Sequence, residues 1–184
     1  LSPGEFSEQA YRKTFIDAYR NILRSVDASK LSKIVMVSST SIYSQNDGKT
    51  VSEGNAMPTN FSGKVLLESE QMLAAYGVEL CVLRLSGIYG PDRLGLLRSV
   101  REKKATLEIG QSSFTNRIHI DDIVAFSNFV VQNKLSGIYN VSDSSPVRKN
   151  ETLKFLASLF EVELETAAAK ASLRRTNKKV SNKK

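Results

Sequence analysis

The sequence predicts an α/β protein built on a parallel sheet, and two observations carry this prediction. Short apolar, β-branched runs at 34–37, 80–83 and 137–141 have the composition of buried strands. The longer segments between them place apolar residues three and four positions apart, which is the period of a helix with one buried face. Strands that alternate with helices in this way are typical of parallel α/β sheets.

The first expected element is a helix over residues 7–26. Ser7 is a suitable N-cap, and Phe6 before it can pack against Tyr11 one turn into the helix. Apolar residues at three- and four-residue steps then predict the buried face: Tyr11, Phe15, Ala18, Ile22 and Val26.

The strand that follows from Lys33, which we expect to be covered on both faces, ends in four hydroxyl residues at positions 38–41. Ligands of open parallel sheets bind at the carboxyl ends of the strands. A long loop follows, and a second helix is expected to begin near Lys64 and to end before Gly77. The unit from 33 to 64 is therefore the predicted centre of the site.

The second half of the chain continues the alternation. Gly87, Gly90 and Pro91 break the chain after the strand over 78–85. Asp121 or Asp122 is expected to cap a later helix. The remaining expected elements are a helix over 94–101, a strand over 137–141 and a helix containing Leu153, Leu156 and Phe160. From Glu161 onward no period is evident, so residues 1–164 are predicted to form one domain, with embedded substrate-side segments at about 86–120 and 143–164.

The net charge of +7 is carried entirely by the end of the chain. From Lys170 onward there are seven basic residues and no acidic one, and the preceding residues are formally neutral. We expect residues 165–184 to be a solvated basic tail. Nucleic acid is a less favoured partner, because no aromatic residue interleaves with these charges.

Cys81 is the single cysteine and lies within the apolar run 80–83, which favours a small buried hydrophobe. One cysteine cannot form a disulfide within the chain, so a reducing, cytoplasmic location is expected. No run approaches the roughly 20 apolar residues that a membrane-spanning helix needs.

Several strings together resemble the extended short-chain dehydrogenase/reductases. Four of them occur in that superfamily's order and spacing: Val37-Ser38-Ser39-Thr40-Ser41-Ile42-Tyr43, Arg84-Leu85-Ser86-Gly87-Ile88-Tyr89-Gly90-Pro91, Asn116-Arg117-Ile118-His119-Ile120-Asp121-Asp122 and Gly137-Ile138-Tyr139-Asn140-Val141. Two more resemble the DG-x-x-V-x-E and G-[RK]-x-L-L-x-x-E segments of the atypical NAD-dependent epimerase/dehydratase-like branch: Asp47-Gly48-Lys49-Thr50-Val51-Ser52-Glu53 and Gly63-Lys64-Val65-Leu66-Leu67-Glu68-Ser69-Glu70. The resemblance extends to Arg174–Asn182. It implies the C-terminal part of a Rossmann-like, doubly wound parallel sheet, with NAD or NADP as cofactor.

The resemblance also implies catalytic positions. In that superfamily a tyrosine acts as general acid/base, a lysine four residues later lowers its pKa and holds the nicotinamide ribose, and a serine or threonine polarises the substrate oxygen. Ser39 matches the hydroxyl residue and Lys64 the lysine, but Asn60 occupies the tyrosine position and Phe15 that of the family's helix asparagine. A carboxamide cannot exchange a proton at physiological pH, so the active site is expected to be atypical.

Two residues are weighed as substitutes for the missing base. Tyr43 is the first surrogate to test, although its position in the resembling family is usually structural. His119, the sole histidine, lies at a strand-to-helix joint, where a structural role is favoured.

The resemblance implies the following further ligand contacts. The cofactor would be held by Ser38, Ser39, Lys64, Ser86, Gly87 and Ile88. The substrate would be held by Thr40, Arg93 and Arg117. Arg117 could hold a phosphate, but sugar-nucleotide epimerases tend to carry that arginine two residues earlier, at Thr115 here. No metal ion is expected.

The phosphate-binding Gly-rich turn of the family has no counterpart, because no G-x-G-x-x-G occurs in the 184 residues. We therefore expect this chain to be part of a longer protein. The favoured function is an NAD(P)-dependent oxidoreductase or epimerase/dehydratase acting on a small polar or sugar-like substrate. The alternative is a catalytically degenerate dinucleotide-binding sensor or scaffold. The oligomeric state is left open, a homodimer included.

Overall fold

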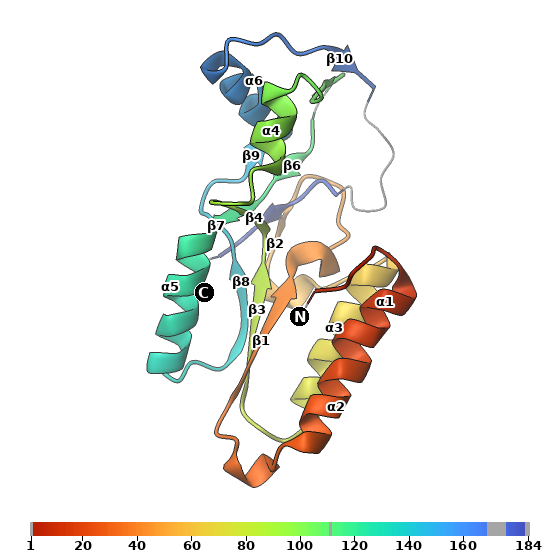
Figure 1. Cartoon of the computed structure of the whole chain (residues 1–184), viewed down its shortest axis with the longest axis vertical. Coiled ribbons are helices and arrows are strands. Elements are labelled where there is room, and N and C mark those ends of the chain that lie inside the picture. Colours follow the sequence, from red (N-terminus) through yellow and green to blue (C-terminus); the bar gives the residue numbers. More distant parts are fainter. Residues whose placement is uncertain (1, 111, 169–175, 183–184) are drawn as a thin grey trace.

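The computed structural model describes residues 2–110, 112–168 and 176–182. Its centre is a three-stranded parallel sheet in the order β1-β3-β8 (Figure 1). The strands are β1 (Ile34–Ser39), β3 (Leu80–Leu85) and β8 (Gly137–Val141). Ile34 lies opposite Leu80, and Cys81 opposite Gly137, so all three strands run in the same direction. The predicted parallel α/β fold is confirmed.

Helices cover both faces of this sheet (Figure 1). On one side lie α1 (Glu8–Arg12), a π-helical turn η1 (Lys13–Asp17), α2 (Ala18–Ser25) and α3 (Phe61–Ala74); on the other lies α5 (Ile120–Gln132). Met36, Leu73 and Val82 form a buried cluster on the α3 side. Cys81, Leu83, Leu85 and Val130 belong to a cluster on the α5 side, which makes the sheet doubly wound. No described helix has the length and apolar character that crossing a membrane requires.

The first helix has the predicted start but a different buried face. Ser7 caps it by accepting a hydrogen bond from the Ala10 amide at 3.2 Å. Beyond Phe15, however, Ile22 is 49% exposed, whereas Tyr19 packs against buried core residues. The π turn η1 causes this difference, because a wider turn adds a residue to the helical register and rotates everything after it.

Strand β1 is covered on one face only in this chain. Met36 is buried, but Val35 and Val37, which point to the opposite face, are 37% and 51% exposed. The expectation that both faces of this strand are covered is therefore wrong for the described residues. The reason is that the apolar cluster on the α5 side contains residues of β3 and β8 but none of β1.

A smaller lobe lies beyond the carboxyl end of the sheet (Figure 1). Its helices α4 (Gly95–Arg101) and α6 (Lys149–Leu159) enclose Val100, Leu153 and Ala157. Three short strand pairs, each separate from the central sheet, accompany these helices: β4 (Gly87–Tyr89) with β7 (Arg117–His119), β5 (Leu107–Glu108) with β10 (Thr166–Ala167), and β6 (Phe114–Thr115) with β9 (Val147–Arg148). The segments expected on the substrate side supply this lobe, while the domain boundaries stay a prediction.

The solvated tail expected at the end of the chain is not found over residues 176–182. There β11 (Lys179–Val180) pairs in parallel with β2 (Thr50–Val51), and both Lys178 and Val180 are buried. The side chains of Asn116 and Asn140 hold this segment by hydrogen-bonding its backbone, and no local periodicity reveals such bonds. The other basic residues of the predicted tail lie outside the described residues: Lys170, Arg174, Arg175, Lys183 and Lys184.

The N-terminal ends of two helices near the site differ from those expected. His119, rather than Asp121 or Asp122, is the N-cap of α5, and its Nδ1 accepts from the Asp121 amide at 3.3 Å. This is a structural role, as favoured for the lone histidine. Helix α3 starts at Phe61, earlier than expected, with Asn60 as its N-cap.

Candidate functional site

A large pocket lies between the carboxyl edge of the sheet and the lobe. It has a volume of about 650 Å³. The last residue of β1 and the residues that follow β1 and β3 line it on the sheet side, and residues of α4 and α6 line it on the other. Five of the predicted site residues are among its lining: Ser39, Thr40, Ser86, Gly87 and Arg117. The structure thus brings the ends of two neighbouring strands to one cavity, as the sheet topology predicts.

A second pocket of about 260 Å³ adjoins the first, because Ser39, Ser41, Thr176 and Lys178 line both. Its other lining residues come from the first helix and the start of α3: Tyr11, Phe15, Asn60, Ser62 and Leu66. The resemblance assigns catalytic positions to Ser39, Asn60 and Phe15. All three therefore meet at this second pocket.

Glycine at position 63 makes this meeting possible. A Cβ atom there would lie 2.8 Å from the Ser41 carbonyl oxygen and 2.9 Å from the Pro58 side chain. Contacts this short are not tolerated, so only glycine lets the first turn of α3 press against the turn η3 (Thr40–Ile42). The glycine of the G-[RK]-x-L-L-x-x-E segment thereby sets the distance between the end of β1 and the start of α3.

Ser39 and Asn60 both use their side-chain oxygens locally. Ser39 Oγ accepts a hydrogen bond from the Ser41 amide at 3.1 Å and caps η3. Its hydroxyl proton is therefore free to be donated to a ligand. Asn60 Oδ1 accepts from the Gly63 amide at 2.8 Å and from Ser62 Oγ at 2.9 Å. Asn60 thus serves as a helix cap at the position where the family carries its tyrosine.

Lys64 lies in the first turn of α3 with an exposed side chain and does not line either pocket. Among the described residues it has no ion-pair partner. The structure therefore does not bring Lys64 to Ser39, and its expected cofactor contact stays a prediction.

Two buried polar atoms of the large pocket lack a partner. Ser86 Oγ and Arg117 Nε are inaccessible to solvent and form no hydrogen bond in the part of the chain that the structure describes. Burial lowers the pKa of Arg117, while Asp143 opposes this effect. Unsatisfied buried donors carry a free-energy cost, so both favour a ligand that supplies acceptors.

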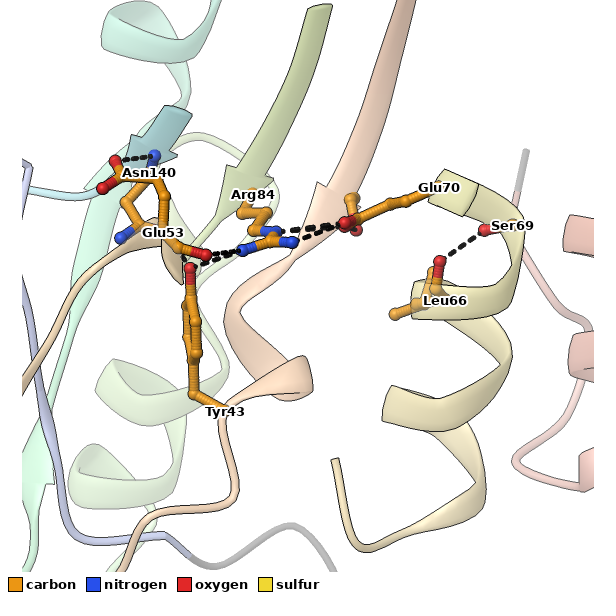
Figure 2. Close-up of polar contacts among 8 residues, drawn as sticks. Tyr43, Glu53, Leu66, Ser69, Glu70, Arg84 and Asn140 are labelled. Atoms are coloured by element: carbon orange, nitrogen blue, oxygen red, sulfur yellow. Dashed lines mark hydrogen bonds and ion pairs between the residues drawn. The ribbon is translucent and has the colours of Figure 1, made fainter. Parts of the chain in front are cut away.

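Tyr43 lies in the core and not in either pocket. It is fully buried, its hydroxyl donates to Asn140 Oδ1 at 2.6 Å, and the same oxygen accepts from Arg84 Nη1 at 2.9 Å (Figure 2). Burial raises the pKa of Tyr43, against the opposing effect of Arg84. A base needs access to its substrate and a pKa near the working pH, so this position argues against the surrogate role expected for Tyr43.

Arg84 is the centre of the buried polar network to which Tyr43 belongs (Figure 2). Arg84 Nη2 lies 2.6 Å from Glu70 Oε2, and Nη1 donates to the Glu53 carbonyl at 2.8 Å. Ser38 Oγ donates to Glu70 Oε1 at 2.6 Å from the neighbouring strand. Ser38 is thus engaged in the core and does not line the pockets, although a cofactor contact was expected of it.

The remaining predicted ligand contacts lie outside the pockets. Ile88 packs with the apolar cluster under α5. Arg93 is exposed, and its amide donates to the Gly90 carbonyl at 3.0 Å in the turn before α4. Their roles stay predictions that this geometry does not support.

The DG-x-x-V-x-E segment fastens the end of the chain beside the site. Gly48 has a φ of +76°, which favours glycine, and its amide donates to the Asn177 carbonyl at 2.7 Å. Glu53 Oε1 accepts from the Asn140 amide at 2.9 Å. The motif therefore holds residues 176–182 in place.

Lys178 is the site residue that sequence reasoning missed. It is 4% exposed and lines both pockets, although it belongs to a run of basic residues that is typical of solvated surface. The signal that could have located it is the asparagine-rich sequence around it, because side-chain amides frequently bond irregular backbone.

Comparisons with known proteins agree with the fold. No protein-family model matches the chain. The chain is 26% identical over 151 residues to the protein YeeZ of Escherichia coli K12, an alignment covering 81% of this chain and 54% of YeeZ. The chain thus spans about half the length of the curated relatives it matches.

Similar solved structures are NAD-dependent epimerase/dehydratase proteins. One from Methylobacillus flagellatus, assigned as an NAD-dependent epimerase/dehydratase, has 31% identity and a TM-score of 0.78. The match covers 95% of this chain and 63% of the Methylobacillus chain. UDP-glucuronic acid 4-epimerase from Bacillus cereus, in complex with NAD, has a TM-score of 0.81 at 18% identity. The match covers 99% of this chain and 63% of the epimerase chain. At that identity the second likeness shows the fold alone. The Rossmann-like α/β fold implied by the sequence motifs is confirmed.

Proposed function

We propose that this chain is part of an NAD(P)-dependent protein of the extended short-chain dehydrogenase/reductase type, with a small polar or sugar-like substrate. The observation that carries the proposal is the position of Ser39, which is the last residue of β1 and lines both adjoining pockets, the smaller one together with Asn60. A hydroxyl donor at the carboxyl edge of a parallel sheet is suited to polarise a substrate carbonyl.

The residues at the end of β3 fit the nicotinamide end of a dinucleotide. Ser86 Oγ is buried without a hydrogen-bond partner, so a carboxamide or ribose hydroxyl could satisfy it. Gly87 adjoins it, and a Cβ there would lie 3.1 Å from the Asn116 carbonyl oxygen, so a side chain would crowd the pocket wall. When bound, the dinucleotide would supply hydride-transfer chemistry.

Three residues of the chain would then contact the substrate or the cofactor. Ser39 donates a hydrogen bond to the substrate oxygen. Arg117, whose Nε lacks a partner, binds an acidic group of the substrate. Lys64 would reach the ribose only if its exposed side chain reorients toward the pocket.

The alternative is a dinucleotide-binding sensor or scaffold without catalysis, and a specific observation favours it. Asn60 has its side-chain oxygen committed to capping α3, and Phe15 places an apolar ring where the family carries an amide. Neither residue can exchange a proton. In this alternative the cofactor still binds, and no substrate is converted.

The test uses the natural full-length protein. NADH and NADPH are titrated by nicotinamide fluorescence, and UDP-glucose, UDP-glucuronic acid and dTDP-glucose are then incubated with the protein and NAD. Products are followed by chromatography and nicotinamide absorbance. Failure to bind either dinucleotide would contradict both functions.

Variants then separate catalysis from binding alone. Ser39→Ala should lower kcat about 10²-fold, as expected for one donor to a developing oxyanion, with dinucleotide affinity unchanged. Ser29→Ala, in the exposed turn that precedes β1 at the opposite end of the strand, is the matched control. Dinucleotide binding without any product would favour the sensor.

Two further expectations accompany the proposal. A cytoplasmic location rests on the single cysteine, Cys81, which is buried. A homodimer is an open alternative, and sedimentation of the full-length protein would decide it.

A further inference from the structure

Lys178 is buried, and no charged group among the described residues pairs with its amine. The residue is 4% exposed, and its Nζ donates to Thr176 Oγ1 at 2.7 Å. No carboxylate of the described residues forms an ion pair with it. Buried lysines are rare unless they are paired, because the charge loses its hydration.

The backbone around Lys178 is fixed from two sides. The Asn116 side chain bonds it like a neighbouring strand, since Nδ2 donates to the Lys178 carbonyl at 2.9 Å and Oδ1 accepts from the Val180 amide at 2.7 Å. The Lys179 amide donates to the Lys49 carbonyl at 3.0 Å. The position of Lys178 in the pocket wall is therefore built by the fold.

The other titratable groups that line the pockets do not compensate its charge. Tyr11 lines the smaller pocket; Lys104, Glu108, Arg117 and Lys149 line the larger one. Glu108, the sole acid among them, is paired with Lys149 at 2.8 Å. Burial alone lowers the pKa of Lys178 to about 8. An amine with such a pKa serves as acid and as base near neutral pH.

The smaller pocket places this amine together with the hydroxyl of Ser39 and with Asn60. The site therefore has a hydrogen-bond donor for a substrate oxygen, but no proton-exchanging group at the position where the family carries its tyrosine.

We propose that Lys178 is the proton-exchanging group of this site. It would take the role of the tyrosine that the resembling family carries at the position of Asn60. The inference rests on the proposed function. When a reduced nicotinamide dinucleotide supplies a hydride to a substrate carbonyl carbon, the carbonyl π pair would move to oxygen and take a proton from the Lys178 ammonium. The products would be an alcohol, a neutral amine and the oxidised dinucleotide. In the reverse direction the neutral amine would take the hydroxyl proton while the oxidised dinucleotide accepts the hydride.

Tyr11 is the competing candidate, because it lines the same pocket. Its ring lies within an aromatic cluster, 5.6 Å from Phe15 and 5.5 Å from Phe61 between ring centroids. The geometry favours a packing role for Tyr11, and the Tyr11→Phe variant tests this distinction.

The first experiment measures the protonation of Lys178 without any substrate. The full-length protein is labelled with trace acetic anhydride between pH 6 and 11, and each lysine is followed by peptide mass spectrometry. Lys30 and Lys49, whose side chains are 83% and 82% exposed, are internal controls. Lys178 should label with a midpoint near pH 8, below the midpoints of both controls. A midpoint near that of the controls, or no labelling of Lys178, would overturn the proposal.

The second experiment separates charge from proton exchange. Lys178→Arg retains a positive charge but cannot deprotonate, and Lys178→Met removes both. Both variants should bind NADH like the parent and lose about 10²–10⁴-fold in kcat on any sugar nucleotide that the parent converts, with little change in KM. Tyr11→Phe should retain turnover. Parental kcat in Lys178→Arg, or a comparable loss in Tyr11→Phe, would overturn the assignment. If the parent protein binds no dinucleotide, the proposed function fails. If it binds a dinucleotide but Lys178 labels like the control lysines, only the role of Lys178 fails.

Discussion

Two buried cations in this protein differ in how their charge is compensated. Arg84 is 1% exposed and bonds the Glu70 carboxylate, the Tyr43 hydroxyl and the Glu53 carbonyl (Figure 2). Lys178 is 4% exposed and bonds one neutral hydroxyl. The Arg84 side chain extends from β3 to Glu70 of α3, whereas Lys178 lies in the wall of the pockets.

This difference separates a structural charge from a functional one. A buried cation that is fully paired has nothing left to offer a ligand, and removing it leaves its partner unsatisfied. A buried cation without a counter-ion lowers stability in the free protein, and such groups cluster at functional sites. Replacing each cation with the same apolar residue should therefore have opposite effects.

Arg84→Met should give the largest effect, a loss of about 3–5 kcal/mol in the free energy of unfolding, because Glu70 would remain buried without its counter-ion. Urea denaturation at pH 7 measures it. Arg12→Met is the matched control, since Arg12 makes a similar two-pronged contact with Glu68 at 2.8 and 2.9 Å on the surface. Equal losses in the two variants would show that burial does not distinguish the pairs.

Lys178→Met should stabilise the protein at pH 7 by up to about 3 kcal/mol, the value of a pKa lowered from 10.5 to about 8. The folded state binds fewer protons than the unfolded state between these pH values. The cost of Lys178 is therefore fully present below pH 8 and disappears as the pH rises to about 10.5.

The stability of the parent should accordingly rise toward that of Lys178→Met across this range. Denaturation curves of both proteins at several pH values measure the difference. A gap independent of pH would contradict the assigned protonation.

Tyr43→Phe should cost less, about 1–3 kcal/mol, because Arg84 and Asn140 each lose one partner within a network that keeps its ion pair. Tyr76→Phe is the control, since Tyr76 makes a single hydrogen bond to the Leu23 carbonyl. Turnover should change little, as Tyr43 lies outside the pockets. Lost turnover with unaltered stability would restore Tyr43 as a candidate base.

Sequence reasoning located the main elements because their signals are local. Continuous apolar runs predicted the sheet strands, helical periodicity and Gly77 predicted α3, and the hydroxyls at the end of β1 predicted one wall of the pocket. The π turn η1 was not predictable in this way, because a helix that widens by one residue keeps its composition while its buried face rotates.

The rest of the site depends on contacts between distant residues. Lys178 lies in a basic segment whose residues alone indicate solvent exposure, and its burial follows from hydrogen bonds to Asn116 and from the pairing of β11 with β2. Ser39 and Asn60 could be placed by resemblance, but the commitment of Asn60 to capping α3 needed coordinates.

The pairing of β11 with β2 also has a consequence for how the protein folds. Lys179 lies opposite Thr50, so this ladder closes a loop that contains most of the chain. Such closure has a large entropic cost and is compensated only when the intervening elements are already packed. We therefore expect the pocket wall that contains Lys178 to form late during folding. In the folded protein, the β11–β2 pairing should open more often than the central sheet. Ligands of the pocket would select the closed form, and hydrogen exchange at the Val180 amide would slow as they bind.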